Sequence, residues 1–207
     1  MPDEAFLARV SNFFCDGFIS RRGGLAVDHG PRRQESLIRH FPIMATEIER
    51  KFQVTGDLWR DGTPGIRIAQ GYLSQDPDRT VRVRIAEESA WLTIKGRCEG
   101  ITRAEFEYAI PLDEARALLD LCLPSVIDKT RYRIPFCGHL WEIDIFHGDN
   151  EGLVIAEVEL ADASISPILP PWVGLEVSSD SRYFNSCLAV MPYAQWRCSK
   201  GVTNRCP

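Results

Sequence analysis

The amino-acid sequence predicts a mainly β protein, in which an all-β core carries a few peripheral helices. After Met44, short segments that alternate apolar and polar residues recur along the chain, and each is bounded by Gly, Pro, Asp or Asn. A period of two residues is typical of strands with one buried face. Helix signals are few, and neither an internal repeat nor a low-complexity linker interrupts the series.

Eight segments fit this strand pattern. The candidate strands are residues 47–54, 67–74, 80–86, 90–95, 103–110, 126–134, 139–146 and 153–160. Between the fifth and the sixth, Pro111 and Asp113 precede apolar residues at helical spacing, and Pro124 ends the pattern. We therefore expect a helix over residues 114–122 with Asp113 as its cap. A second short helix is expected from residue 180 or 181 to about residue 190.

Nearly every predicted strand has one charged face and one apolar face. In the first strand, Glu47, Glu49 and Lys51 share a face opposite Ile48 and Phe52. The charges recur as same-sign pairs two residues apart. Acidic pairs stand at positions 47/49, 105/107, 142/144 and 157/159, and basic pairs at 82/84, 129/131 and 131/133. Such pairs repel unless an opposite charge lies close.

Two arrangements are compatible with these faces. They can point to solvent while the apolar faces form a sandwich core, or the strands can close into a barrel with a polar lumen. The same-sign pairs favour the barrel. Clustered Arg and Lys suit phosphate oxygens, and paired carboxylates suit Mg²⁺ or Mn²⁺ that already carries phosphate ligands. The expected ligand is a metal-bound polyphosphate.

A family resemblance follows from the motifs. Residues 46–52, which contain Glu-x-Glu-x-Lys, resemble the opening motif of the CYTH superfamily, the triphosphate tunnel metalloenzymes. Further blocks follow in the order of that family: Gln70-Gly71-Tyr72-Leu73, Val81-Arg82-Val83-Arg84, Thr93-Ile94-Lys95, Arg103-x-Glu105-x-Glu107, Asp128-Lys129-Thr130-Arg131-Tyr132, Trp141-Glu142-Ile143-Asp144, Ala156-Glu157-Val158-Glu159-Leu160 and Asp180-x-Arg182-Tyr183-x-Asn185. The resemblance covers residues 44 to about 191 and is greatest to the short bacterial inorganic triphosphatases (tripolyphosphatases).

The resemblance implies an eight-stranded antiparallel closed barrel with a charged lumen, the triphosphate tunnel. It implies metal ligands at Glu47, Glu49, Asp144, Glu157 and Glu159. It implies phosphate-binding cations at Lys51, Arg82, Arg84, Lys95, Lys129 and Arg131, with Arg182 reaching in from the C-terminal helix. Lys51 and Tyr72 are expected to act together near the scissile phosphate, with a packed wall residue as the alternative for Tyr72. Arg103, Glu105, Glu107, Arg133 and Glu142 are expected as supporting residues of the lumen.

The function that the resemblance implies is metal-dependent hydrolysis of inorganic tripolyphosphate at its terminal phosphoanhydride, which yields diphosphate and phosphate. Mg²⁺ or Mn²⁺ is the expected cofactor and a small polyphosphate the expected partner; a homodimer is left open. A class IV-type adenylate cyclase and a thiamine triphosphatase are the alternative enzymes. A noncatalytic module that binds polyphosphate or nucleotides is the alternative outside catalysis.

The composition and the two ends of the chain lead to further expectations about partners, compartment and domain bounds. The 207 residues carry a net charge of −5, which disfavours attraction to nucleic acid or anionic lipid, and no apolar run approaches the roughly 20 residues of a spanning helix. Seven cysteines without a C-x-x-C pair are typical of reduced thiols in a cytoplasm. We expect residues 44–193 to form the domain, after an extension over 1–43 that is mobile or a misassigned start, and before a tail over 194–207.

Overall fold

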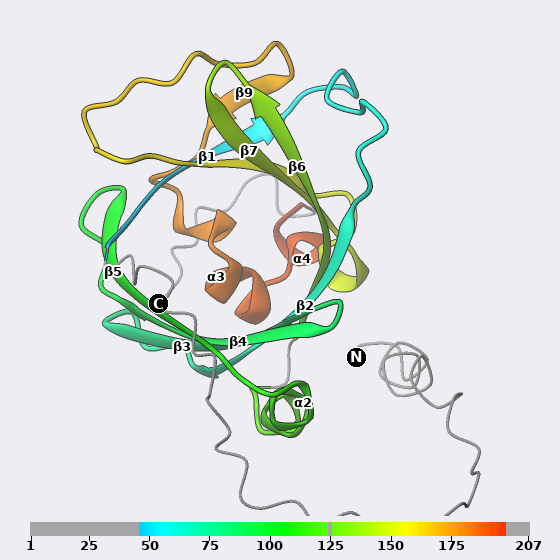
Figure 1. Ribbon diagram of the computed structural model, residues 1–207, viewed down its shortest axis with the longest axis vertical. Helices are drawn as coiled ribbons and strands as arrows, with labels where there is room; N and C mark the ends of the chain where they lie inside the picture. The colour runs from blue at the N-terminus through cyan, green and yellow to red at the C-terminus, as the bar shows by residue number, and fades with distance from the viewer. Residues whose placement is uncertain (1–45, 124–125, 198–207) are drawn as a thin grey trace, which may run out of the picture. The chain divides into compact units, whose positions relative to one another are not determined.

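The computed structural model of the protein describes residues 46–123 and 126–197. In these ranges nine strands form one antiparallel sheet in the order β5-β4-β3-β2-β6-β7-β8-β1-β9, and β1 also pairs with β5. That additional pairing closes β1–β8 into a barrel, which Figure 1 shows end-on. The predicted eight-stranded closed antiparallel barrel is therefore confirmed.

The strands follow the alternating segments of the sequence. Their bounds are β1 Thr46–Val54, β2 Ile66–Ser74, β3 Arg79–Ala86, β4 Ser89–Gly96, β5 Thr102–Ala109, β6 Ile127–Phe136, β7 His139–Phe146, β8 Val154–Glu159 and β9 Val173–Glu176. All eight predicted strands are present, and each predicted end lies within two residues of the observed one. The short β9, which pairs with β1 outside the barrel order, was not predicted.

The helices differ more from expectation. The first is α2, Leu112–Asp120, which begins earlier than predicted because Pro111 occupies the cap position and its carbonyl accepts the first helical hydrogen bond from Ala115. The prediction that Asp113 is the cap is wrong. Asp113 lies inside the first turn, where its negative charge interacts favourably with the helix dipole. The second predicted helix is split into η2, Ser181–Tyr183, and α3, Asn185–Val190, because Phe184 is extended. Short helices η1, Gly148–Asn150, and α4, Tyr193–Arg197, were not predicted.

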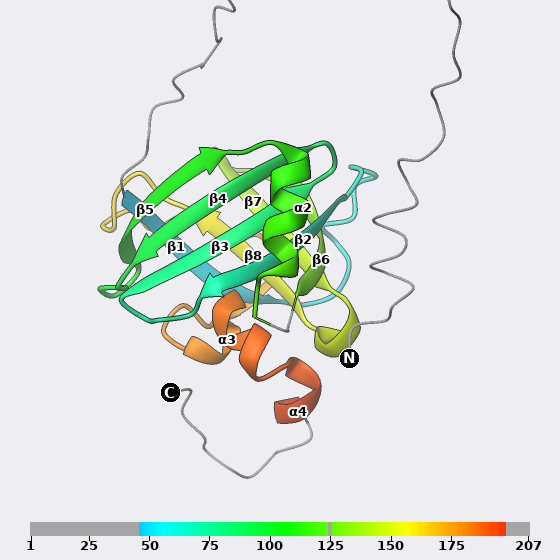
Figure 2. The ribbon, with the colours of Figure 1, turned by 90° about the horizontal axis from the view of Figure 1, so that it is seen from below.

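Apolar side chains on the outside of the barrel form two packed layers. Helix α2 lies across β3 and β4 (Figure 2), where Ala115 packs on Val83 and Ile85. On the opposite wall, segments 55–65 and 160–172 cover the outer faces of β1, β6, β7 and β8. That layer consists of Phe52, Trp59, Ile134, Trp141, Ile143, Ala156, Val158, Leu160 and Trp172. Because these layers bury the outward apolar faces, the alternating charged faces point into the lumen.

The C-terminal helices cover one end of the barrel. Figures 1 and 2 place α3 and α4 across this end, and Leu188 and Ala189 of α3 pack against Tyr72, Ile127 and Ile155 of the strands. One end of the lumen is therefore apolar, and its charged part lies beyond Tyr72.

Some predictions concern residues outside the described ranges. These are the extension over 1–43 and the end of the tail, residues 198–207. Within the described ranges, α4 crosses the predicted boundary at residue 193, and its Trp196 packs edge-on against Tyr183. None of the helices described is long and apolar enough to cross a membrane.

Candidate active site

The charged faces of the strands meet inside the barrel. Seven of their side chains are buried: Lys51, Arg82, Lys95, Lys129, Arg131, Asp144 and Glu157. Charged residues are rarely buried unless an opposite charge neutralises them. Each of the seven makes an ion pair with another charged residue of the lumen. This arrangement excludes the sandwich with solvated charged faces.

A first ion-pair cluster joins β1, β6, β7 and β8. It contains Glu49, Lys51, Lys129, Arg131, Arg133, Glu142, Asp144 and Glu157. The Nζ of Lys51 lies 2.5 Å from Glu49 Oε2 and also donates to Glu157. Arg131 donates from Nε to Asp144 Oδ1 over 2.7 Å and from Nη2 to Glu157 Oε2 over 2.7 Å. One guanidinium thus spans carboxylates of two strands, which its fork of donors permits.

A second ion-pair cluster joins β1 with β3, β4 and β5. It contains Glu47, Arg82, Arg84, Lys95, Arg103, Glu105 and Glu107. Glu47 accepts hydrogen bonds from Lys95 Nζ at 2.8 Å and from Arg103 Nε at 2.6 Å. Glu47 and Glu49 belong to the same strand, so β1 connects the two clusters.

The two glutamates of β1 differ in their titration. Burial alone would raise the pKa of Glu47, but the charges of Lys95 and Arg103 outweigh it and hold that pKa well below the ordinary value. Burial and then the charge of Glu157 raise the pKa of Glu49 to about 7, against the lowering effect of Lys51. Glu47 is therefore a carboxylate at neutral pH, and Glu49 exchanges its proton near neutrality.

Burial also changes the pKa of three other groups in the lumen. Burial and then the charge of Arg131 lower the pKa of Lys129 to about 8. Burial and then the charge of Arg82 lower the pKa of Arg84 to about 10. Burial raises the pKa of the Tyr72 hydroxyl to about 12, so this hydroxyl keeps its proton. In Lys129 and Arg84, burial and a neighbouring arginine thus act in the same direction, because both disfavour the charged form.

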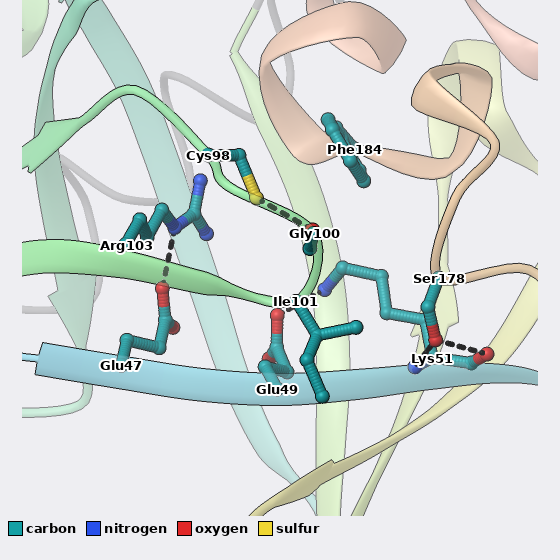
Figure 3. A pocket seen from close by; sticks show the side chains of 9 residues that line it. All are labelled: Glu47, Glu49, Lys51, Cys98, Gly100, Ile101, Arg103, Ser178 and Phe184. Carbon is teal, nitrogen blue, oxygen red and sulfur yellow. Dashed lines mark hydrogen bonds and ion pairs between the residues drawn. The ribbon is translucent and has the colours of Figure 1, made fainter. Parts of the chain in front are cut away.

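A small pocket opens onto the lumen beside the start of α3. Figure 3 shows its lining, which consists of Glu47, Glu49, Lys51, Cys98, Gly100, Ile101, Arg103, Ser178 and Phe184. The turn between β4 and β5 borders it on one side, and the segment that leads into α3 borders it on the other. Both β1 glutamates and Lys51 therefore contribute to the lining of this pocket.

Most of the site residues predicted from the sequence lie together in the two clusters. These are Glu47, Glu49, Lys51, Arg82, Arg84, Lys95, Lys129, Arg131, Asp144 and Glu157. Tyr72 lies beside them on the lumen wall at the edge of the apolar end, and its hydroxyl accepts a hydrogen bond from Gln70 Nε2 at 3.3 Å. Tyr72 makes no hydrogen bond to Lys51 among the described side chains.

Two predicted residues are placed differently. Glu159 is exposed at the end of β8, in register with Glu49. Its partial desolvation and the charges of Glu47 and Glu105 nevertheless raise its pKa. Arg182 does not reach the lumen clusters. Its Nη2 lies 2.5 Å from Asp180 Oδ2, its guanidinium stacks on Trp196, and its side chain is 45% exposed. The neighbouring Asp180 satisfies Arg182 locally, which the sequence pattern does not reveal.

Two uncharged polar residues of the lumen were missed as site residues. Gln70 and Thr93 are each fully buried, and Gln70 Oε1 has no hydrogen-bond partner among the described residues. Gln70 is in register with Arg84, and Thr93 with Arg82, so both share the inward face. Strand alternation places both on the inward face, but a pattern of charged pairs does not include neutral side chains.

The lumen has a donor set that fits a divalent cation. Its carboxylates are the hard oxygen ligands that Mg²⁺ and Mn²⁺ prefer. Burial is the first cause of the raised pKa of Glu49, and the charges of Glu157 and Glu47 add to it; a cation bound there would lower that pKa. The described residues do not hold three metal-ligating side chains gathered as a ready cage. Mg²⁺ commonly takes only one or two carboxylates, together with water and substrate phosphates, so the set suffices.

Comparison with known proteins agrees with this geometry. The CYTH domain family matches residues 45–186. An inorganic triphosphatase of Acetivibrio thermocellus is 46% identical over 155 residues, which is 74% of this chain and 99% of that protein. An inorganic triphosphatase of Nitrosomonas europaea is 36% identical over 152 residues, 70% of this chain and 97% of that protein. A crystal structure of an inorganic triphosphatase, 34% identical, matches with a TM-score of 0.53 over 72% of this chain and 97% of the other.

Proposed function

This chain belongs to the CYTH domain family, and we propose that it is a metal-dependent inorganic triphosphatase that cleaves tripolyphosphate to diphosphate and phosphate. The observation that carries the proposal is the barrel lumen, in which buried Arg and Lys side chains pair with carboxylates from β1, β5, β7 and β8. The two relatives that are 46% and 36% identical support it, since both are named inorganic triphosphatases.

Six buried or largely buried cations are proposed to bind the triphosphate: Lys51, Arg82, Arg84, Lys95, Lys129 and Arg131. Each is paired with a carboxylate. Phosphate oxygens can take the place of those carboxylates, because Arg binds them bidentately and Lys binds them as a point charge. A short polyphosphate enclosed by strands would thereby be held along its length, in keeping with the closed barrel.

The metal is proposed to be Mg²⁺ or Mn²⁺, held by carboxylates among Glu47, Glu49, Asp144, Glu157 and Glu159 together with substrate oxygens. When bound, such an ion neutralises charge on the phosphoryl oxygens and lowers the pKa of bound water. Glu157 is central to this set. Burial alone would raise its pKa, but the charges of Lys51 and Arg131 hold that pKa well below the ordinary value, so it is a carboxylate at neutral pH.

The protein's own part in the reaction is binding, orientation and charge stabilisation. Phosphoryl transfer requires little covalent chemistry from the enzyme, so fixed cations at the leaving group supply much of the catalysis. Lys51 Nζ, held between Glu49 and Glu157, is proposed to stabilise the charge that develops at the scissile phosphate. Tyr72 retains its proton and is proposed to donate a hydrogen bond there.

The test is release of orthophosphate from tripolyphosphate with Mg²⁺, with Mn²⁺ and with EDTA. We expect turnover with a metal and none with EDTA; equal rates in all three would refute the metal requirement. Glu157→Gln should abolish turnover while the melting temperature shows a folded protein. The matched control is Glu151→Gln, because the Glu151 side chain is 72% exposed, and it should keep full activity. Full activity of Glu157→Gln would contradict the proposal that the reaction takes place in the barrel lumen.

A substrate panel tests selectivity within the same site. Cyclic AMP and diphosphate from ATP would indicate a cyclase, and orthophosphate from thiamine triphosphate would indicate a thiamine triphosphatase. Calorimetric binding of tripolyphosphate without turnover in either metal would indicate a binding module.

A further inference from the structure

A row of hydrogen-bonded side chains crosses three strands of the lumen wall. Arg82 of β3 is in register with Thr93 of β4, and Thr93 is in register with Glu107 of β5. Arg82 Nη2 lies 3.2 Å from Thr93 Oγ1, and Thr93 Oγ1 lies 2.8 Å from Glu107 Oε2. Arg84 Nη2 completes the row at 3.0 Å from each oxygen of Glu107. A neutral hydroxyl therefore stands between a buried guanidinium and a carboxylate.

The direction of each hydrogen bond in this row is fixed by chemistry. A guanidinium only donates, and an ionised carboxylate only accepts. Thr93 has a single hydroxyl proton, so it accepts from Arg82 and donates to Glu107. Thr93 is itself fully buried, and water does not readily replace it. Within this row of described residues, the Thr93 hydroxyl is therefore the neutral group that connects Arg82, through Glu107, with Arg84.

The row holds together two cations that would otherwise repel each other. Arg82 and Arg84 share one face of β3, and the lowered pKa of Arg84 reflects burial and the charge of Arg82. Glu107 neutralises Arg84 directly, whereas its Oε2 is 3.5 Å from Arg82 Nη2, beyond a good hydrogen bond. Thr93 bridges that gap. The Nε atoms of both arginines are buried and have no hydrogen-bond partner among the described residues, so neither guanidinium uses all its donors within the protein.

We propose that Thr93 is a positioning residue whose hydroxyl, acting through Arg82 and Glu107, orients the paired guanidinium groups for the triphosphate and sets the affinity for it. This inference rests on the proposed function of the lumen. The hydroxyl is already committed to its two partners, so its contribution is preorganisation of Arg82. Preorganised donors spare the ligand the free energy of ordering them. Its loss should therefore weaken binding more than it slows the chemical step.

Three variants test the inference: Thr93→Val, Thr93→Ser and Thr130→Val. Valine keeps the shape of threonine and removes the hydroxyl, and serine restores it. Thr130→Val is the matched control, because Thr130 is also partly buried and hydrogen-bonded, at 2.8 Å from His147 Nε2, but faces away from the lumen. We expect Thr93→Val to raise KM for tripolyphosphate by roughly tenfold, as for one charge-assisted hydrogen bond, with kcat within about threefold.

Thr93→Ser should return KM to within about threefold of the parent, and Thr130→Val should leave it unchanged. An unchanged KM in Thr93→Val, or a serine variant as weak as the valine variant, would overturn the inference. If Thr93→Val does not fold, Thr93→Ala removes the same hydroxyl in a smaller side chain and should raise KM likewise; an unchanged KM would count against the positioning role.

A binding measurement separates this inference from the proposed function. Tripolyphosphate in EDTA should raise the melting temperature of the parent protein more than that of Thr93→Val. If the parent is stabilised more than Thr93→Val but releases no orthophosphate with either metal, the positioning role is supported and the proposed triphosphatase activity is rejected. Equal stabilisation of both proteins would reject the positioning role whatever the activity.

Discussion

Lys129 donates a hydrogen bond from Nζ to Asp144 Oδ2 over 2.6 Å, and the two side chains are only 2% and 0% exposed. A buried ion pair contributes little net stability compared with an apolar pair, because desolvation offsets the attraction between the charges. Removal of one partner is different, since it leaves an unpaired charge in the interior. The clusters of the lumen therefore make the fold depend on the residues proposed to bind the ligand.

Asp144→Asn should lower the free energy of unfolding by about 3–5 kcal/mol, as measured by urea denaturation in EDTA. The substitution removes the negative charge that neutralises Lys129 and accepts two hydrogen bonds from Arg131. The matched control is Asp78→Asn, whose ion pair with Arg97 is exposed; it should cost less than about 1 kcal/mol. Equal costs for the two variants would contradict the enclosure of the Lys129–Asp144 pair.

Glu49→Gln should make the metal-free protein more stable at pH 8, by at most about 3 kcal/mol, and should have little effect at pH 5. Burial and the charge of Glu157 raise the pKa of Glu49 from 4.5 to about 7. The folded state thus favours the protonated carboxyl, whose stabilisation is complete below pH 4.5 and is lost as the pH rises through 7. Glutamine mimics the protonated form at every pH. Thermal unfolding in EDTA checks this, and a less stable variant at pH 8 would disprove it.

Much of the fold could be predicted from the sequence because alternation is a local property. The eight barrel strands each carry enough alternating residues to be recognised. Strand β9 has only Val173–Glu176, and four residues are too few to establish a period. The split between η2 and α3 depends on the extended backbone of Phe184, which a helical pattern over 180–190 does not show.

The site could be predicted in part. Same-sign pairs on one strand face indicated that opposite charges lie near, and the barrel supplies them. Which charges meet depends on tertiary geometry: Arg131 of β6 reaches Glu157 of β8 across the intervening β7. Arg182 illustrates the limit, since a contact with Asp180 two residues away keeps it out of the clusters. A charge pattern does not distinguish such local pairing from a position in the lumen.

Arg131→Lys should lower kcat/KM for tripolyphosphate by roughly 100-fold or more, whereas Arg133→Lys should change it by less than about threefold. Arg131 is buried and contacts Glu142, Asp144 and Glu157 at once, which a lysine ammonium on its flexible stem cannot reproduce. Arg133 pairs with Glu142 at 3.0 Å, and its side chain is 57% exposed. Orthophosphate release measures both effects. Similar losses of kcat/KM in the two variants would show that burial of an arginine of β6 does not determine its contribution to activity.

The cysteines of the barrel should differ in reactivity. Cys98 is exposed, whereas Cys122 is partly buried, its thiol lies 3.3 Å from the Leu118 carbonyl oxygen, and burial raises its pKa to about 11. Because the thiolate is the reactive form, iodoacetamide at pH 8 should alkylate Cys98 at least roughly tenfold faster than Cys122, as followed by peptide mass spectrometry. In concentrated urea the two rates should converge, since unfolding removes the burial. Equal alkylation rates in the folded protein would mean that α2 does not shield Cys122. If the two rates still differ in urea, the neighbouring residues in the sequence, and not burial, cause the difference.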